Sequence, residues 1–254
     1  MGLLLFITWA CGGGTVPRPQ DPSVDHGYGT LAAALMQAVM DEQPTAGLQQ
    51  QLAEADPKKL AEELTNDGLR RAFWINVYNA YIIISLRGHE ELFEDRGDFF
   101  TEERFTVAGQ SLSFDLVEHG ILRRSKNKLS LGYLNKLSVN KFEKMFRVDA
   151  VDARIHFALN CGATSCPPVR VYHPDQVEQE LDDSVSKYLR KVTEVEADEV
   201  STTVLFSWFR NDFSDRGGIT AYLHRYHAIP STLTDPDISF KEYNWTLDID
   251  NFVE

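Results

Sequence analysis

The stretch LRRAFWINVYNAYIIISLRG, residues 69–88, decides how the rest of the chain must be arranged. Apolar residues fall on every face of a helix drawn through it, which predicts a helix buried on all sides. Asn76 and Asn79 interrupt the run three positions apart, so they share one side of that helix. Because buried amides need hydrogen-bond partners, we expect both to tie the helix to a loop or strand, with a direct role in chemistry as the alternative.

A second informative stretch is RIHFALNCGATSCPP, residues 154–168. Apolar and other residues alternate from Ile155 to Asn160, which predicts a strand with His156 and Asn160 on the face opposite the core. The residues that follow must form a loop, because Pro167 and Pro168 forbid a helix there. We therefore expect an α+β fold: a single domain whose buried central helix packs on a small, mostly antiparallel sheet containing this strand, with helices around it.

Further elements follow from local patterns. Residues 28–43 form an amphipathic helical pattern, and a second helix should begin at Pro57 with Asp56 as its N-cap. Residues 104–126 predict a strand, a turn and a helix on which Asp115, His119 and Arg123 recur every four residues. That stripe is either a surface ladder of charges or a face turned towards a site. A helix from Asp175 and a hairpin over residues 193–207 should follow.

The composition limits the possible partners. The formal net charge is −13 at pH 7, and a nucleic-acid partner needs a basic surface, so we expect no nucleic-acid binding. The acidity also argues against contact between the folded domain and an anionic membrane. The chain has no Gly-rich phosphate loop, no dinucleotide fingerprint and no zinc-protease helix, so we expect no cofactor.

The first residues, MGLLLFITWACGGG, predict export. The apolar run is too short to span a bilayer but suits a signal peptide, with Cys11 as a lipidation site. Trp9 and the lack of a preceding Lys or Arg depart from that pattern, and a buried N-terminal strand is the alternative. We expect a signal segment over residues 1–11, a flexible tether over 12–27 and one globular domain over 28–254. The protein would then be anchored by lipid in a bacterial cell envelope, with no other membrane contact.

The residues around Cys161 include the types that a thiol enzyme would need. A catalytic thiol needs a neighbouring base or positive field to lower its pKa. His119 or His156 could be that base, and Glu118 or Asn160 could orient its imidazole. Strict alternation along the predicted strand would put Cys161 on the face away from His156, which favours His119.

The same residues allow two other interpretations. Cys161 and Cys166 enclose four residues, and a turn of that length can bring them within disulfide distance, as a structural staple or as a redox-active pair. A metal site would join His119 and His156 to the cysteines. However, the cysteine spacing is wider than in the usual zinc loop, and adjacent Glu118 and His119 cannot both point at one ion, so we expect no metal.

Five segments of the chain resemble one known family. They are AFWINVYNAYII, VEHGILR, RIHFALNCGATSCPPVRVY, LFSWFRNDF and YNWTLD, which run in this order from about residue 30 to the C-terminus. Together they resemble the domain of unknown function 547 family of bacteria and plants, which has no established activity. The residues that match its pattern are Asn76, Asn79, Glu118, His119, Arg123, Arg154, His156, Cys161 and Cys166.

The resemblance implies a single domain in which these segments converge. Some family members are joined to glutaredoxin-like domains, which hints at thiol chemistry. The hypothesis is a thiol-dependent hydrolase or acyl-transfer enzyme that uses Cys161 with a His base. The alternatives are a non-catalytic envelope binding or structural module closed by a Cys161–Cys166 disulfide, and a thiol redox protein. The substrate is not indicated.

Overall fold

The structure, a computed structural model, describes residues 27–253. The expected signal segment, the lipidation site at Cys11 and nearly all of the tether lie outside the described residues. Within them, no helix combines the length and the apolar character needed to cross a membrane.

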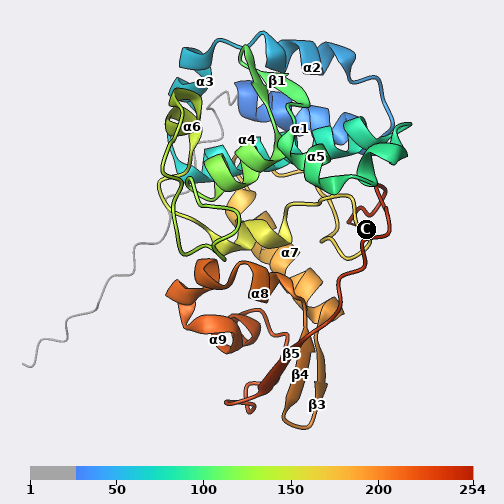
Figure 1. Cartoon of the computed structure of the whole chain (residues 1–254), viewed down its shortest axis with the longest axis vertical. Helices are drawn as coiled ribbons and strands as arrows, with labels where there is room; N and C mark the ends of the chain where they lie inside the picture. Colours follow the sequence, from blue (N-terminus) through green and yellow to red (C-terminus); the bar gives the residue numbers. More distant parts are fainter. Residues whose placement is uncertain (1–26, 254) are drawn as a thin grey trace, which may run out of the picture.

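The central helix is α4, Asp67–Leu86, and it is buried along almost its whole length. It begins where the Asn66 side chain accepts a hydrogen bond from the amide of Leu69. Helix α1, Gly27–Met40, packs along it in the upper body of the molecule (Figure 1). The predicted buried helix is therefore confirmed.

Short elements surround α1 and α4, with α2 and α3 packed on α1. The first are α2 (Ala46–Ala53) and α3 (Pro57–Glu63), and Asp56 caps α3 as expected, accepting from the amides of Lys58 and Lys59. After α4 come η1 (Glu90–Phe93), α5 (Arg96–Thr101), and β1 (Phe105–Val107) paired antiparallel with β2 (Gln110–Leu112). Then come η2 (Leu116–Leu122), a π-helix, and α6 (Lys141–Phe146).

The predicted strand Ile155–Asn160 is wrong. Residues Ala153–Phe157 form the short 3₁₀-helix η3, which begins where Asp152 accepts a hydrogen bond from the amide of Arg154. Beyond it, the Asn79 side chain donates to the carbonyl of Ala158 (2.8 Å) and accepts from the amide of Asn160 (2.9 Å). The Asn79 side chain thus makes the hydrogen bonds to this backbone that a neighbouring strand would otherwise make. Helix α4 therefore has no strand at Ile155–Asn160 beside it; its contact with a sheet is at β1, where Tyr81 stacks on Phe105 with the ring centroids 4.4 Å apart.

The C-terminal part adds a second hydrophobic cluster around Phe157 and Phe206. Helix α7 (Val177–Val192) leads into the predicted hairpin, β3 (Glu194–Glu196) and β4 (Glu199–Thr202), and β5 (Asp237–Phe240) joins β4 in parallel. Between β4 and β5 lie α8 (Leu205–Trp208), η4 (Arg210–Arg216) and α9 (Gly218–Arg225). The described residues are mostly helical with small sheets, so the α+β fold class is confirmed.

The chain end returns to the cysteine loop. Single backbone bridges join Ala163 to Leu247 and Val169 to Phe252. This return brings Tyr243 and Trp245, more than seventy residues later in the sequence, against Cys161 and Cys166.

Candidate functional site

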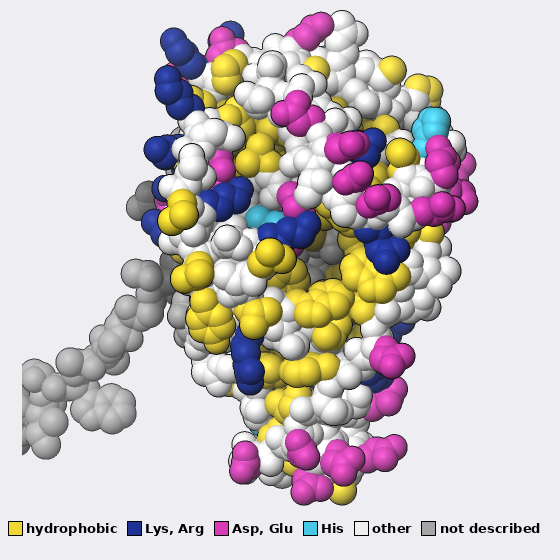
Figure 2. Space-filling model, viewed as in Figure 1, with side chains coloured by type: hydrophobic (Ala, Val, Ile, Leu, Met, Phe, Trp, Pro, Cys, Tyr) yellow, Lys and Arg dark blue, Asp and Glu magenta, His cyan; other side chains and the backbone are white. Residues whose placement is uncertain are grey.

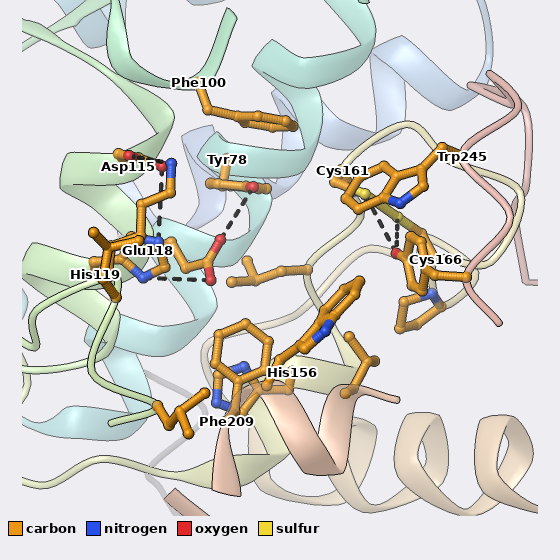
Figure 3. A pocket seen from close by; sticks show the side chains of 18 residues that line it. Tyr78, Phe100, Asp115, Glu118, His119, His156, Cys161, Cys166, Phe209 and Trp245 are labelled. Atoms are coloured by element: carbon orange, nitrogen blue, oxygen red, sulfur yellow. Dashed lines mark hydrogen bonds and ion pairs between the residues drawn. A yellow bond between two sulfur atoms is a disulfide. The ribbon is translucent and has the colours of Figure 1, made fainter. Parts of the chain in front are cut away.

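A cavity of about 450 Å³ lies where these segments converge. The four residues predicted to be catalytic, Glu118, His119, His156 and Cys161, all line it. In Figure 3 the two cysteines lie with Trp245 on one side of the cavity, and Asp115, Glu118 and His119 lie on the other. The remaining lining residues are Tyr78, Phe100, Lys128, Leu129, Leu131, Leu159, Cys166, Pro167, Leu205, Trp208, Phe209 and Tyr243.

The wall beside the cysteines is aromatic. The Tyr243 ring lies 4.6 Å from that of Trp245 and 4.9 Å from that of Trp208, measured between centroids. On the outer side of Trp245, the guanidinium of Arg96 lies 4.8 Å from its ring. These rings form a rigid apolar surface suited to a flat or apolar ligand group.

Cys161 and Cys166 form a disulfide in the structure, with their Cα atoms 6.3 Å apart. The loop between them is held by buried amides. Asn79 fixes the backbone on one side, and Asn160 donates to the carbonyl of Pro167 (2.8 Å) and accepts from the amide of Gly162 (2.7 Å). Asn76 holds Tyr172 in the same two-bond manner, so the expected tying role of both helix amides is confirmed.

The two sulfurs have different surroundings. Cys161 is half-buried, whereas Cys166 is only 3% exposed. The backbone amide of Cys161 donates to Sγ of Cys166 at 3.0 Å. The Tyr243 hydroxyl lies 3.1 Å from the same sulfur and 3.4 Å from Sγ of Cys161 (Figure 3). Burial raises the pKa of Tyr243 well above its usual value, so the phenol keeps its proton and donates.

The opposite end of the cavity is polar. Glu118 lies between Tyr78, whose hydroxyl is 3.4 Å from Oε2, and His119, whose Nδ1 is 3.5 Å from Oε1. Asp115 accepts from Lys128 at 2.7 Å. The stripe Asp115, His119 and Arg123 is therefore turned towards a site and is not a surface ladder, since His119 and Arg123 are buried.

His119 is a neutral donor in this arrangement. The Arg123 guanidinium has only hydrogens to offer and lies 3.0 Å from Nδ1, so Nδ1 accepts and the ring proton lies on Nε2. Burial, together with the charge of Arg123, lowers the pKa of His119 to about 3. An imidazole of such low pKa is a weak base at neutral pH.

His156 is oriented by a carboxylate that the sequence analysis did not single out. Oδ2 of Asp212 lies 2.9 Å from Nε2 of His156 and 2.7 Å from Nε of Arg123. Burial raises the pKa of Asp212, but His156 and Arg123 lower it further, to about 2, so the carboxylate is charged. Nε2 of His156 therefore carries the ring proton, and its Nδ1 is left as the basic nitrogen.

The Phe209 ring completes this group. It stacks on His156 at 3.8 Å and lies 4.7 Å from the guanidinium of Arg123. Burial lowers the pKa of His156, against the opposing effect of Asp212.

Five predicted site residues lie outside the cavity lining. Asn76, Asn79 and Asn160 hold backbone, while Arg154 is buried in an ion-pair network with Asp152, Glu178 and Asp182. Arg123 lies behind His119 and Phe209.

The predicted thiol–imidazole pair is not formed in this state. Among residues 27–253 no hydrogen bond joins Cys161 to either His119 or His156, and Cys161 is engaged in the disulfide.

Sequence reasoning missed Asp212, Tyr78 and Tyr243 as parts of the site. All three lie inside the motifs NDF, VYN and YNW that carried the family resemblance, so the motifs marked the segments but not the side chains. Within the described residues, no group of three or more His, Cys, Asp or Glu side chains is placed to hold a metal ion.

Comparison with known families covers part of these motifs: the matched region holds VYN but neither NDF nor YNW. The profile of the family described as "Protein of unknown function, DUF547" matches residues 62–189, about half of the chain, and the protein belongs to that family. The match includes α4, η2 and the cysteine loop. Searches of curated proteins and of solved structures found no match.

Proposed function

We propose that the protein carries out thiol–disulfide exchange at Cys161–Cys166. One observation carries the proposal: the amide of Cys161 and the hydroxyl of Tyr243 both donate towards Sγ of Cys166, while Cys161 is the less buried of the two cysteines that line the cavity. Exchange is fastest when the attacked sulfur is accessible and the departing sulfur is stabilised as a thiolate.

The reaction needs a thiol as co-reactant. Its thiolate attacks Sγ of Cys161, a new sulfur–sulfur bond forms, and the Cys161–Cys166 bond breaks with its electron pair on Cys166. The two hydrogen bonds hold that thiolate. A second thiolate then attacks the incoming sulfur, which releases Cys161 and leaves the two co-reactant thiols oxidised to a disulfide and the protein reduced by two electrons.

The cavity indicates the class of thiol. Its aromatic wall next to the disulfide suits an apolar or aromatic body, and its far end presents Asp115, Glu118 and the Nε2 hydrogen of His119. Carboxylates bind donors and cations, so a molecule with an apolar part and an amino group fits both ends. The volume limits it to a small molecule or a short side-chain segment.

The test is to trap the mixed disulfide. The purified oxidised protein is mixed with reduced glutathione, quenched with acid and an alkylating agent, and digested for mass spectrometry. We expect glutathione on Cys161 and the alkyl group on Cys166. Glutathione mainly on Cys166, or no adduct unless the protein is denatured, would overturn the proposal.

A second function is favoured by the Asp212–His156 pair. Once Cys161 is reduced, it lies in the same cavity as an imidazole oriented by a buried carboxylate, the arrangement used by thiol-dependent hydrolases and acyl-transfer enzymes. Cys166→Ala separates the two functions. This variant loses exchange but would keep thioester or ester hydrolysis without any reductant, and Cys161→Ala would lose both.

We also propose export to a bacterial envelope, with Cys11 carrying the lipid. The apolar run before Cys11 supports it, and a disulfide persists more readily outside the cytoplasm. In a bacterial host, labelled palmitate should be incorporated into the wild-type chain and not into Cys11→Ser. Equal labelling of both would remove the lipid site.

A further inference from the structure

The segment Arg123–Arg147 reverses the charge of the molecule locally. It holds eight Lys and Arg residues and one acidic residue, in a chain whose net charge is −13. Of the basic residues, Arg123, Lys128 and Lys136 make ion pairs, with Asp212, Asp115 and Glu143 respectively. Among residues 27–253, the side chains of Arg124, Lys126, Lys141 and Lys144 have no carboxylate partner within 4.0 Å.

The same segment carries most of the exposed large apolar side chains of the described residues. Leu129 is 89% exposed and Leu134 is 64% exposed, and Leu131, Tyr133, Leu137 and Met145 are exposed as well. In Figure 2, hydrophobic and basic side chains lie together on the side where the yellow-green loop lies in Figure 1, while acidic side chains gather at the opposite side and at the bottom.

These side chains are exposed although the backbone of the loop is hydrogen-bonded. The loop is closed by hydrogen bonds from Asn127 to Leu134 (2.8 Å) and from Lys136 to Ser125 (2.7 Å). It is fixed to η4 by Asn211, which donates to the carbonyls of Leu131 and Gly132. The fold therefore holds leucines in water, at a loss of free energy that a binding partner would recover.

At Gly132 the loop lies very close to the side chains of Asp212 and Arg123. A Cβ at this position would clash with Oδ1 of Asp212 and would lie 3.2 Å from Nη2 of Arg123. The backbone at Gly132 therefore lies directly over the buried Arg123–Asp212 pair, with Leu131 and Tyr133 on either side of this contact.

The net charge of the whole chain argues against an anionic membrane, but the charge of this segment is reversed, and from these observations we propose that the segment Arg123–Arg147, the basic-apolar surface, docks the folded domain on an anionic lipid bilayer. Apolar side chains enter the headgroup region while neighbouring lysines and arginines bind anionic headgroups, and the two contributions add. An acidic protein surface would satisfy the charges but would leave the exposed leucines without an apolar contact. Lys128, Leu129 and Leu131 also line the cavity, so docking turns its mouth towards the lipid.

The test is vesicle sedimentation with the full chain. Vesicles of phosphatidylcholine alone are compared with vesicles that contain about 30% phosphatidylglycerol. We expect about tenfold tighter binding to the anionic vesicles, weakened by salt. Leu134→Ser/Leu137→Ser and Lys141→Glu/Lys144→Glu should each weaken binding about tenfold.

Matched controls lie elsewhere on the surface. Phe240→Ser removes an exposed apolar side chain of β5, and Lys58→Glu/Lys59→Glu reverses an exposed basic pair of α3. Both should leave binding unchanged, and every variant contains the same first 26 residues. The proposal is overturned if the controls lose as much affinity as the loop variants. It is also overturned if the protein binds neither vesicle type. Binding to immobilised polyglutamate through Lys141 and Lys144 in that case would identify an acidic protein partner.

Discussion

The hydroxyl of Tyr243 is the single polar side-chain group within hydrogen-bond distance of the disulfide among the described residues. Tyr243→Phe removes it and keeps the ring between Trp208 and Trp245. Because a hydrogen bond to a charged group contributes about 1.5–3 kcal/mol, we expect the rate of reduction by glutathione to fall about tenfold or more. Stopped-flow or quenched alkylation measures that rate.

Tyr188→Phe is the matched control. Its hydroxyl is also buried near the loop, donating to the carbonyl of Ser165, but does not touch either sulfur. Equal slowing in both variants would show that the effect comes from loop packing and not from stabilisation of the Cys166 thiolate.

Asn79 and Asn76 give a second pair of matched variants at this scale. Each makes two buried hydrogen bonds to backbone, so we expect Asn79→Ala and Asn76→Ala to destabilise the protein by similar amounts, about 3 kcal/mol. Urea denaturation measures this. Of the two, Asn79→Ala should change the exchange rate, because Asn79 holds the residue next to Cys161. An unchanged rate in Asn79→Ala would contradict that positioning role.

At the scale of the element, the π-helix η2 depends on a glycine. A Cβ at Gly120 would lie 2.9 Å from Cδ1 of Leu116 and 3.0 Å from the carboxyl carbon of Glu143, so η2 and α6 approach closely there. Gly120→Ala should therefore destabilise the protein by about 1–3 kcal/mol through overpacking. Gly47→Ala, in α2 with open space around it, should leave the stability unchanged or raise it by less than about 1 kcal/mol. The opposite order in thermal denaturation would refute this account of η2.

The elements also show what the sequence could predict. Uniform apolarity identified α4, and the Asp-Pro pair identified the start of α3, because both signals are local. The strand at Ile155–Asn160 failed because its alternation was real but its backbone bonds go to Asn79, some eighty residues earlier. A period-two pattern indicates which side chains are buried and not which groups pair with the backbone.

The site was predictable where the residue type alone indicates a function. Glu118, His119, His156 and Cys161 were recognised by residue type, and all line the cavity. Asp212 was not, because its function as partner of His156 and Arg123 depends on tertiary contacts across 56 and 89 residues of sequence.

At the scale of the whole molecule, buried groups set the dependence of stability on pH. The pKa of His119 is lowered by burial and by Arg123 to about 3, and burial lowers that of His156. A histidine in the unfolded chain takes up a proton near pH 6.5, so below that pH the unfolded state binds more protons than the folded state. Stability should fall by up to about 1.4 kcal/mol per pH unit for each such histidine as pH falls from 6.5.

A second loss follows at lower pH. Burial opposes ionisation of Asp152, but Arg154 and Arg71 lower its pKa to about 2, and Asp212 behaves similarly. Their stabilisation is present above about pH 4 and is lost as pH falls towards 2. Urea denaturation at several pH values measures both losses, and His119→Gln should reduce the slope between pH 6.5 and 5. An unchanged slope would contradict the neutral, buried state of His119.

The most direct test of the central claim is a redox titration of the intact protein under native conditions. The oxidised protein is equilibrated in glutathione buffers of increasing reducing strength, alkylated, and read at Cys161 and Cys166 by mass spectrometry. We predict no labelling without reductant, then labelling of both cysteines together with a single midpoint. Labelling of either cysteine before reduction would contradict the resting disulfide, and resistance to reduction until the protein unfolds would show that the bond is a structural staple and not the site of exchange.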